Sequence, residues 1–134
     1  MRSIPLVLAS VLALAGCAQS DALKTTRADT SDATRCFRTD DIRNFRAANT
    51  TDLYVRTSRD NVFLITTTGC WDMDTALAIA VTPGRGGGGY SCVGDPVDVR
   101  VPGGAGAGNG RCRGLVTKSL TAEEAAALPS RSRP

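Results

Sequence analysis

Four cysteines, at positions 36, 70, 92 and 112, constrain the fold of this chain of 134 residues more than any other feature. All the aromatic residues, three Phe, two Tyr and one Trp, lie between the first and the last of these cysteines, so any core must lie there. We expect a compact domain over residues 36–128, which at that size buries only roughly 60–65% of its unfolded surface. Such a core is marginal, and two disulfides would stabilise it materially.

The N-terminus has the pattern of a secretory signal peptide. Arg2 precedes an apolar run from Ile4 to Ala15, and no further charge occurs before Asp21. The run is shorter than the roughly 20 apolar residues that a membrane-spanning helix needs. A buried N-terminal core helix is the alternative interpretation.

The apolar run ends in Leu14-Ala15-Gly16-Cys17, which resembles the lipobox of bacterial lipoproteins. The resemblance implies that residues 1–16 are a signal peptide and that Cys17 becomes the first residue of the mature protein. Its sulfur then carries a diacylglyceryl group with acyl chains such as palmitate, and two or more acyl chains anchor a protein stably. Ala18 rather than Asp follows the cysteine, which favours the inner leaflet of the outer membrane, facing the periplasm. The implied partners are the membrane and the machinery that processes and sorts lipoproteins.

Two polar segments flank the expected domain. Residues 17–35 comprise the lipidated cysteine and a stretch in which Leu23 is the only large apolar residue. We interpret this stretch as a flexible tether with a root-mean-square reach of roughly 25 Å. Residues 129–134 are expected to form a disordered tail.

Export would place the other four cysteines in an oxidising compartment, where an even number indicates two disulfides. No two cysteines have C-x-x-C spacing, so a redox centre and the usual zinc knuckles have little support. If residues 97–101 pair with 111–116, Cys112 lies opposite about Arg100 and Cys92 is roughly 25 Å away, whereas a disulfide needs Cα atoms within about 7 Å. We therefore predict the pairs Cys36–Cys112 and Cys70–Cys92. Alternatively, the turn at residues 94–96 folds Cys92 back toward Cys112.

The apolar pattern predicts a mainly β fold, a small antiparallel sheet or barrel of about five strands with a short C-terminal helix and two disulfides. Two apolar runs around the polar stretch 58–61 indicate a hairpin, and Val97, Val99 and Val101 alternate with polar residues as in a half-buried strand. Thr121 and Glu124 have the spacing of a capping box, which predicts the start of the helix. The expected strands are at residues 53–55, 62–65, near 81, 97–101 and 115–120, with Gly-rich loops at 86–89 and 103–110.

Several short motifs, in this order, resemble a family of short four-cysteine bacterial lipoproteins known only as a domain of unknown function. They are Cys36-Phe37, Asp41-Ile42-Arg43-Asn44-Phe45, Leu53-Tyr54-Val55, Cys70, Cys92-Val93-Gly94-Asp95 and Cys112. The resemblance covers about residues 36–120, and the Gly-rich insertions depart from the family's more compact spacing. It implies no activity, ligand or partner.

The chain contains no histidine, which excludes Ser-His-Asp and Cys-His catalysis and His-ligated metals. Paired carboxylates are a second source of acid–base chemistry, but roles in turns and caps explain their positions without any chemistry. The stretch 72–74 lacks most ligands of a calcium loop, and neither glycine run continues into a phosphate-binding loop. We expect no metal and no cofactor. The carboxylate pairs are Asp40 with Asp41, Asp72 with Asp74, and Asp95 with Asp98.

Arginines are frequent between residues 35 and 59, and aspartates are interleaved with them. We interpret this region as a solvated, self-neutralised face, the alternative being a patch for lipid phosphates, lipopolysaccharide or an acidic partner. The net charge of +3 falls to about +2 without Arg2, which gives no support for nucleic-acid binding. Trp71 is expected to pack over a disulfide rather than serve as an exposed binding anchor. The arginines are Arg35, Arg38, Arg43, Arg46, Arg56 and Arg59.

These features together predict a lipid-anchored envelope lipoprotein that is a non-enzymatic binding or structural accessory module for an envelope protein or polymer. One alternative is an inhibitor of a periplasmic hydrolase that inserts the loop 84–90 into the enzyme's cleft. Another is a carboxylate-based hydrolase that uses Asp95 or Asp98.

Overall fold

The protein forms two antiparallel sheets in a computed structural model that describes residues 35–86, 88–103 and 110–134. The predicted signal peptide, the lipobox with Cys17 and the tether up to residue 34 lie outside the described residues. Within the described part, no helix is long and apolar enough to cross a membrane.

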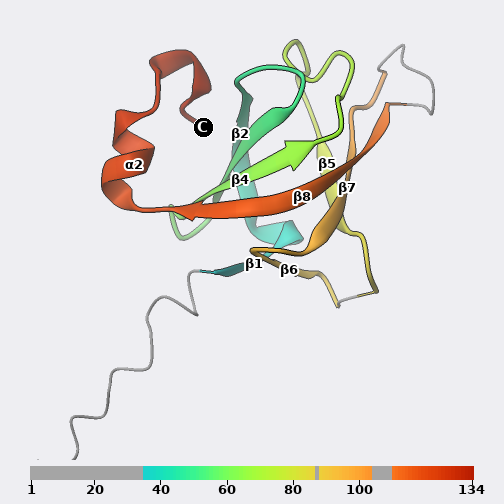
Figure 1. Ribbon diagram of the computed structural model, residues 1–134, viewed down its shortest axis with the longest axis horizontal. Coiled ribbons are helices and arrows are strands. Elements are labelled where there is room, and N and C mark those ends of the chain that lie inside the picture. Colours follow the sequence, from blue (N-terminus) through green and yellow to red (C-terminus); the bar gives the residue numbers. More distant parts are fainter. Residues whose placement is uncertain (1–34, 87, 104–109) are drawn as a thin grey trace, which may run out of the picture.

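The larger sheet has six strands in the order β2-β3-β4-β8-β7-β5, and β1 and β6 form a separate two-stranded ribbon (Figure 1). The mainly β prediction with a short C-terminal helix is confirmed, although the strands number more than the expected five. The elements are β1 (Cys36–Arg38), the 3₁₀ turn η2 (Thr39–Asp41), β2 (Ile42–Ala47), β3 (Asp52–Thr57), β4 (Val62–Thr67), β5 (Ala80–Pro83), β6 (Tyr90–Cys92), β7 (Pro96–Arg100), β8 (Arg111–Leu120), α2 (Ala122–Ala127) and the 3₁₀ turn η3 (Ser130–Ser132).

The core lies on the inner face of the curled six-stranded sheet, because alternate residues of each strand point to the same side. The predicted alternation in β7 is confirmed: Val97 and Val99 are buried, whereas Arg100 is exposed. Phe37 from β1 covers one end of this core, with its ring 4.6 Å from that of Phe63. The buried side chains also include Leu53, Val55, Ile65, Met73, Val81, Val101 and Val116.

The disulfide pairs are Cys36–Cys92 and Cys70–Cys112, so the predicted pairing is wrong. β7 pairs with β8 as predicted, and Cys112 lies opposite Val99, one residue from the predicted register. This register excludes only one of the three possible pairings. The choice between the other two depends on the pairing of β1 with β6, which places Cys36 opposite Cys92. Strands of three residues show no periodicity from which this pairing follows.

The C-terminal segment folds back onto the domain (Figure 1). The capping box of α2 is formed as predicted, with the Glu124 backbone N–H donating to the Thr121 hydroxyl. The expected disordered tail is not observed, because residues 130–132 form the turn η3 and Ser132 is buried. Arg133 donates to the carbonyl oxygens of Ala126 and Leu128, at 2.7 and 2.9 Å. These bonds satisfy acceptors that the end of a short helix leaves without an intrahelical partner.

Candidate binding cleft

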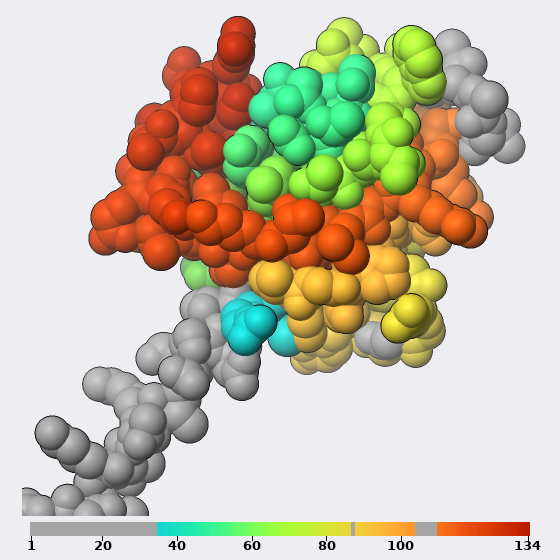
Figure 2. Space-filling model, viewed as in Figure 1, coloured from blue at the N-terminus to red at the C-terminus, as the bar shows by residue number. Residues whose placement is uncertain are grey.

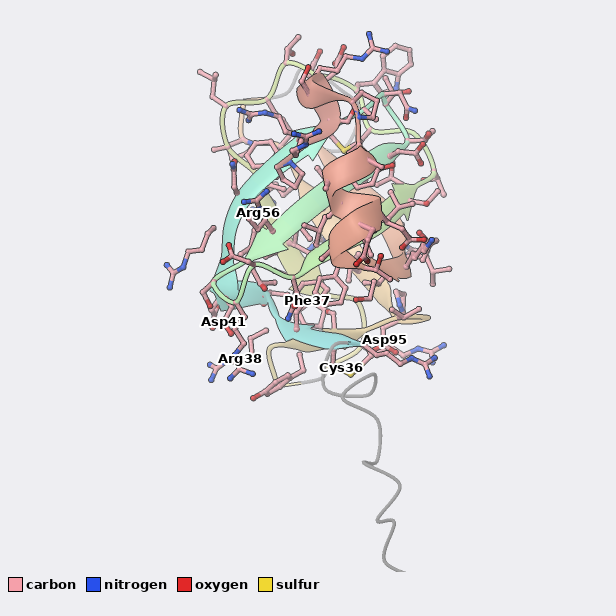
Figure 3. All side chains as sticks on the ribbon, turned by 90° about the vertical axis from the view of Figure 1, so that its left-hand side faces the viewer. Cys36, Phe37, Arg38, Asp41, Arg56 and Asp95 are labelled. Carbon is pink, nitrogen blue, oxygen red and sulfur yellow. A yellow bond between two sulfur atoms is a disulfide. The ribbon has the colours of Figure 1, made fainter. Side chains whose placement is uncertain are left out.

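A cleft of about 280 Å³ lies between the β1–β6 ribbon and the turn that joins β3 to β4. Its lining combines a buried ring, two guanidinium groups, a phenol, an amide and a carboxylate. Figure 3 shows four of these residues, Cys36, Phe37, Arg38 and Asp41, gathered at one end of the domain. The full lining is Cys36, Phe37, Arg38, Asp41, Thr57, Arg59, Asn61 and Tyr90.

The β1–β6 ribbon forms one wall of the cleft. Arg38 lies directly opposite Tyr90 in this ribbon, and the Arg38 guanidinium stands 5.6 Å from the centre of the Tyr90 ring, in cation–π range. The Cys36–Cys92 disulfide closes the other end of the ribbon, with Cα atoms 3.9 Å apart. A two-stranded ribbon is marginal by itself, so this cross-link helps to hold Arg38 and Tyr90 in place.

The turn at residues 58–61 forms the opposite wall. The Thr57 N–H donates to the Asn61 carbonyl at 3.0 Å, and Asp60 has a positive φ of 60°. The Ser58 N–H also donates to the carbonyl of Asp41 at 2.8 Å, which ties this turn to η2. Because η2 follows β1 directly, this bond connects the turn to the end of the ribbon, and the cleft is preformed.

The cleft lining holds two guanidiniums, Arg38 and Arg59, and one carboxylate, Asp41, which forms no ion pair with a described residue. Arg38 forms an ion pair of 3.7 Å with Asp40, and both side chains are at least half exposed, so this pair contributes little to stability. Arg59 forms no ion pair with any described residue. A guanidinium recognises a carboxylate or a phosphate by paired N–H donors. The cleft therefore suits a small anionic group that lies beside the apolar surface of Phe37 and Tyr90.

The arginines from residue 35 to 59 do not form one face. Arg38 and Arg59 reach the cleft, whereas Arg43 and Arg46 project from β2, where Arg46 donates to the carbonyl of Phe45 at 3.1 Å. The Nε of Arg56 is buried and has no hydrogen-bond partner among the described atoms. The predicted neutralisation by interleaved aspartates is seen at Arg38.

The predicted carboxylate pairs serve several different local roles. Asp95 accepts a hydrogen bond of 2.8 Å from the Cys92 N–H, which is a turn-capping role. Asp98 points outward from β7, and Asp72 and Asp74 are exposed in the turn after β4. In residues 35–86, 88–103 and 110–134, no three Cys, Asp or Glu side chains are placed to hold a metal ion.

Trp71 does not pack over a disulfide, so the expectation for this residue is wrong. Its side chain is 76% exposed, and Met73 instead joins Cys70 and Cys112 in the core. Asp72, which stands between Trp71 and Met73 in the sequence, has a positive φ of 63°. The backbone turns there, so the two neighbouring side chains point in different directions. Leu77 in the same loop is 99% exposed.

Sequence reasoning did not find the roles of Asn61 and Tyr90. Tyr90 reaches the cleft only because β6 pairs with β1, more than 50 residues earlier in the chain. The cysteines were the available signal, because the correct pairing of Cys36 with Cys92 brings β1 beside β6.

One comparison with known proteins gives a match. A family model described as "Family of unknown function (DUF6491)" matches residues 1–128. No curated protein and no solved structure is similar to the chain.

Proposed function

Since the chain belongs to this family of unknown function, we propose from its own residues that it is a lipid-anchored binding module of the bacterial envelope. In this proposal the domain faces the periplasm and recognises an anionic group on an envelope protein or polymer. The observation that carries the proposal is the preformed cleft, in which Arg59 has no described ionic partner and Tyr90 offers an exposed ring.

The lipid anchor is supported by the sequence Leu14-Ala15-Gly16-Cys17 after a short apolar run. Cleavage before Cys17 leaves a thioether-linked diacylglyceryl group, and at least two acyl chains anchor a protein stably. Ala18 favours the outer membrane, where the domain would hang into the periplasm. The two disulfides suit that oxidising compartment.

The proposed anchor, Cys17, precedes the first residue of the cleft lining, Cys36, by a short stretch of sequence. Cys36 lines the cleft and is also the first residue of β1. The tether predicted for residues 18–35 would have a reach of roughly 25 Å, so the cleft would work close to the membrane surface. Anchoring also raises the effective concentration of the cleft near any partner that is held at the same membrane.

The cleft's size limits what it can hold. Pockets for whole small molecules span roughly 300–1,000 Å³, and this cleft, at about 280 Å³, is just below that range. It therefore suits one side chain or one terminal group of a larger ligand. A free carboxylate of a peptide is the simplest group of this kind.

The anchor is tested by mass spectrometry of the mature N-terminal peptide and by fractionation of the envelope. We expect an acylated peptide that begins at Cys17 and a protein that partitions with the outer membrane. The Cys17→Ala variant should be neither cleaved at this position nor acylated. An unmodified N-terminus upstream of Cys17 in the native protein would disprove the anchor.

The cleft is tested by a photo-crosslinking amino acid at position 61 in the native envelope, with position 43 on β2 as the control site. We expect a discrete product from position 61 that position 43 does not give. The Arg38→Gln/Arg59→Gln variant should lose this product, whereas Arg43→Gln/Arg131→Gln, which removes the same charge, should keep it. Equal products from both sites, or no effect of the cleft variant, would refute the proposed function.

A further inference from the structure

Three arginines lie close together on the outer face of β7 and β8, outside the cleft. Arg100 on β7 lies directly opposite Arg111 on β8, and Arg113 follows two residues later on the same face. All three side chains are exposed. Figure 2 shows β8 as an orange band at the molecular surface.

The arrangement has a physical cost, because like charges directly opposite one another in a sheet repel. None of the three guanidiniums forms an ion pair with a described residue. Asp98 lies opposite Arg113 in the register, yet its carboxylate also forms no ion pair within the described ranges. This face therefore exposes three positive groups beside one carboxylate and has an excess of positive charge, although the net charge of the whole chain is only +3.

Two hollows adjoin these arginines. One, of about 200 Å³, is lined by Arg100 and Arg111 together with Ala80, Thr82 and Asp98. The other, of about 300 Å³, is lined by Arg113, Gly114 and Leu115 of β8 together with four threonines. These are Thr66 and Thr67 of β4, Thr68 directly after β4, and Thr117 of β8. Leu115 is 43% exposed there. Two positive side chains, Arg111 and Arg113, are thus followed along β8 by an apolar one, Leu115.

We propose that this face binds an extended acidic segment of a partner protein. Residues two apart on a strand are separated by roughly 6.6–6.8 Å, so Arg111 and Arg113 match the spacing of carboxylates at alternate positions of an extended peptide. Each guanidinium binds a carboxylate by paired N–H donors, and an apolar side chain of the segment fills the hollow at Leu115.

The shape of the face favours a peptide over a lipid surface. Arg100 and Arg111 line one hollow and Arg113 lines a second, shallower one, and a planar layer of headgroups does not enter the first. A single protruding chain does. This surface lies on other strands than the cleft, so its partner goes beyond the proposed function and can be tested separately.

The test uses a fluorescent Glu/Val peptide, in which Glu occupies two alternate positions and Val the next position on the same face of the extended chain. A Gln/Val peptide, with Gln in place of each Glu, is the uncharged control, and anisotropy is measured at low and physiological salt. We expect the Glu/Val peptide to bind, and Arg100→Thr/Arg111→Thr to weaken this binding about tenfold or more. Arg43→Thr/Arg131→Thr is the matched control with the same net charge, and it should change the affinity less than about twofold. Thermal unfolding of both variants checks that they are folded.

Three outcomes would overturn the proposal. Equal losses in the two double variants would show that net charge alone attracts the peptide, and unchanged binding in Arg100→Thr/Arg111→Thr would show that the face is not used. Binding to vesicles with anionic lipid, lost in this variant while peptide binding persists, would assign the face to the membrane. Failure of the Arg38→Gln/Arg59→Gln variant to lose the position-61 product bears on the cleft and leaves this test unaffected.

Discussion

Removal of the Cys70–Cys112 disulfide tests both the pairing and the energetic role of the cross-links. These cysteines are 42 residues apart in the sequence. A cross-link of that span removes enough entropy from the unfolded chain to contribute about 4 kcal/mol at 25 °C. Small domains have a total stability of about 5–15 kcal/mol. The Cys70→Ala/Cys112→Ala variant should therefore lose a large part of its free energy of unfolding.

The assay is urea unfolding followed by far-UV circular dichroism. Fluorescence is a poor probe here, because the single tryptophan, Trp71, is 76% exposed in the folded protein and its environment changes little on unfolding. The Cys36→Ala/Cys92→Ala variant is the matched comparison, since its span of 56 residues predicts a similar entropic loss of about 4 kcal/mol.

Titration of free thiols in a Cys17→Ser background decides the pairing independently of stability. With Cys36 bonded to Cys92, the oxidised Cys70→Ala/Cys112→Ala variant has no free thiol. If Cys36 were bonded to Cys112 and Cys70 to Cys92, this variant would have two partnerless cysteines and both would react. Reactive thiols, or a loss of stability below about 1 kcal/mol, would refute the reasoning.

Three further predictions concern single positions. Gly103 and Gly110 both have positive φ, but an added Cβ meets nothing within 4 Å at Gly103 and overlaps the Val101 carbonyl oxygen at Gly110. Gly103→Ala should therefore lower the free energy of unfolding by about 1 kcal/mol, and Gly110→Ala by about 2 kcal/mol more. Equal losses in urea unfolding would contradict this prediction. A hydrogen bond from Lys118, and to a smaller extent one from the Thr121 backbone, lowers the pKa of Glu124 from its ordinary value of 4.5. The ionised Glu124 therefore stabilises the fold above the unfolded-state pKa, and this stabilisation is lost as the pH falls through the lower folded-state pKa. Unfolding between about pH 6 and pH 3 should therefore show a shallower acid destabilisation in Glu124→Gln, and identical slopes would oppose the assignment. Arg111→Thr should raise the free energy of unfolding by about 0.2–1 kcal/mol, because it removes a like-charged cross-strand neighbour, and a decrease would show that the two arginines do not repel.

The elements predicted correctly are those with a local signal. The β3–β4 hairpin follows from two apolar runs around a polar turn, and the start of α2 follows from the Thr121 and Glu124 spacing. The strand at β7 follows from alternating valines. In each case the residues that carry the pattern are close together in the sequence, so their interactions are already specified locally.

The incorrect predictions concern contacts between distant segments. Trp71 follows Cys70 directly, but the backbone turn at Asp72 buries Met73 in its place. The tail after residue 128 looks like polar sequence without structure, yet Arg133 returns to bond the end of α2. The arginine face has no sequence signature either, because Arg100 and Arg111 become neighbours only through the register of β7 and β8.

The sequence by itself determined the mainly β class, the hairpin, the helix cap and the presence of cross-linkable cysteines, because these depend on residue type and on short-range spacing. Only the tertiary structure decided which cysteines pair, which arginines meet and where the cleft lies. Those features require β1 to find β6 and β7 to align with β8. Such alignments are selected by burial of the whole core, since a slip of one residue would turn its side chains toward water.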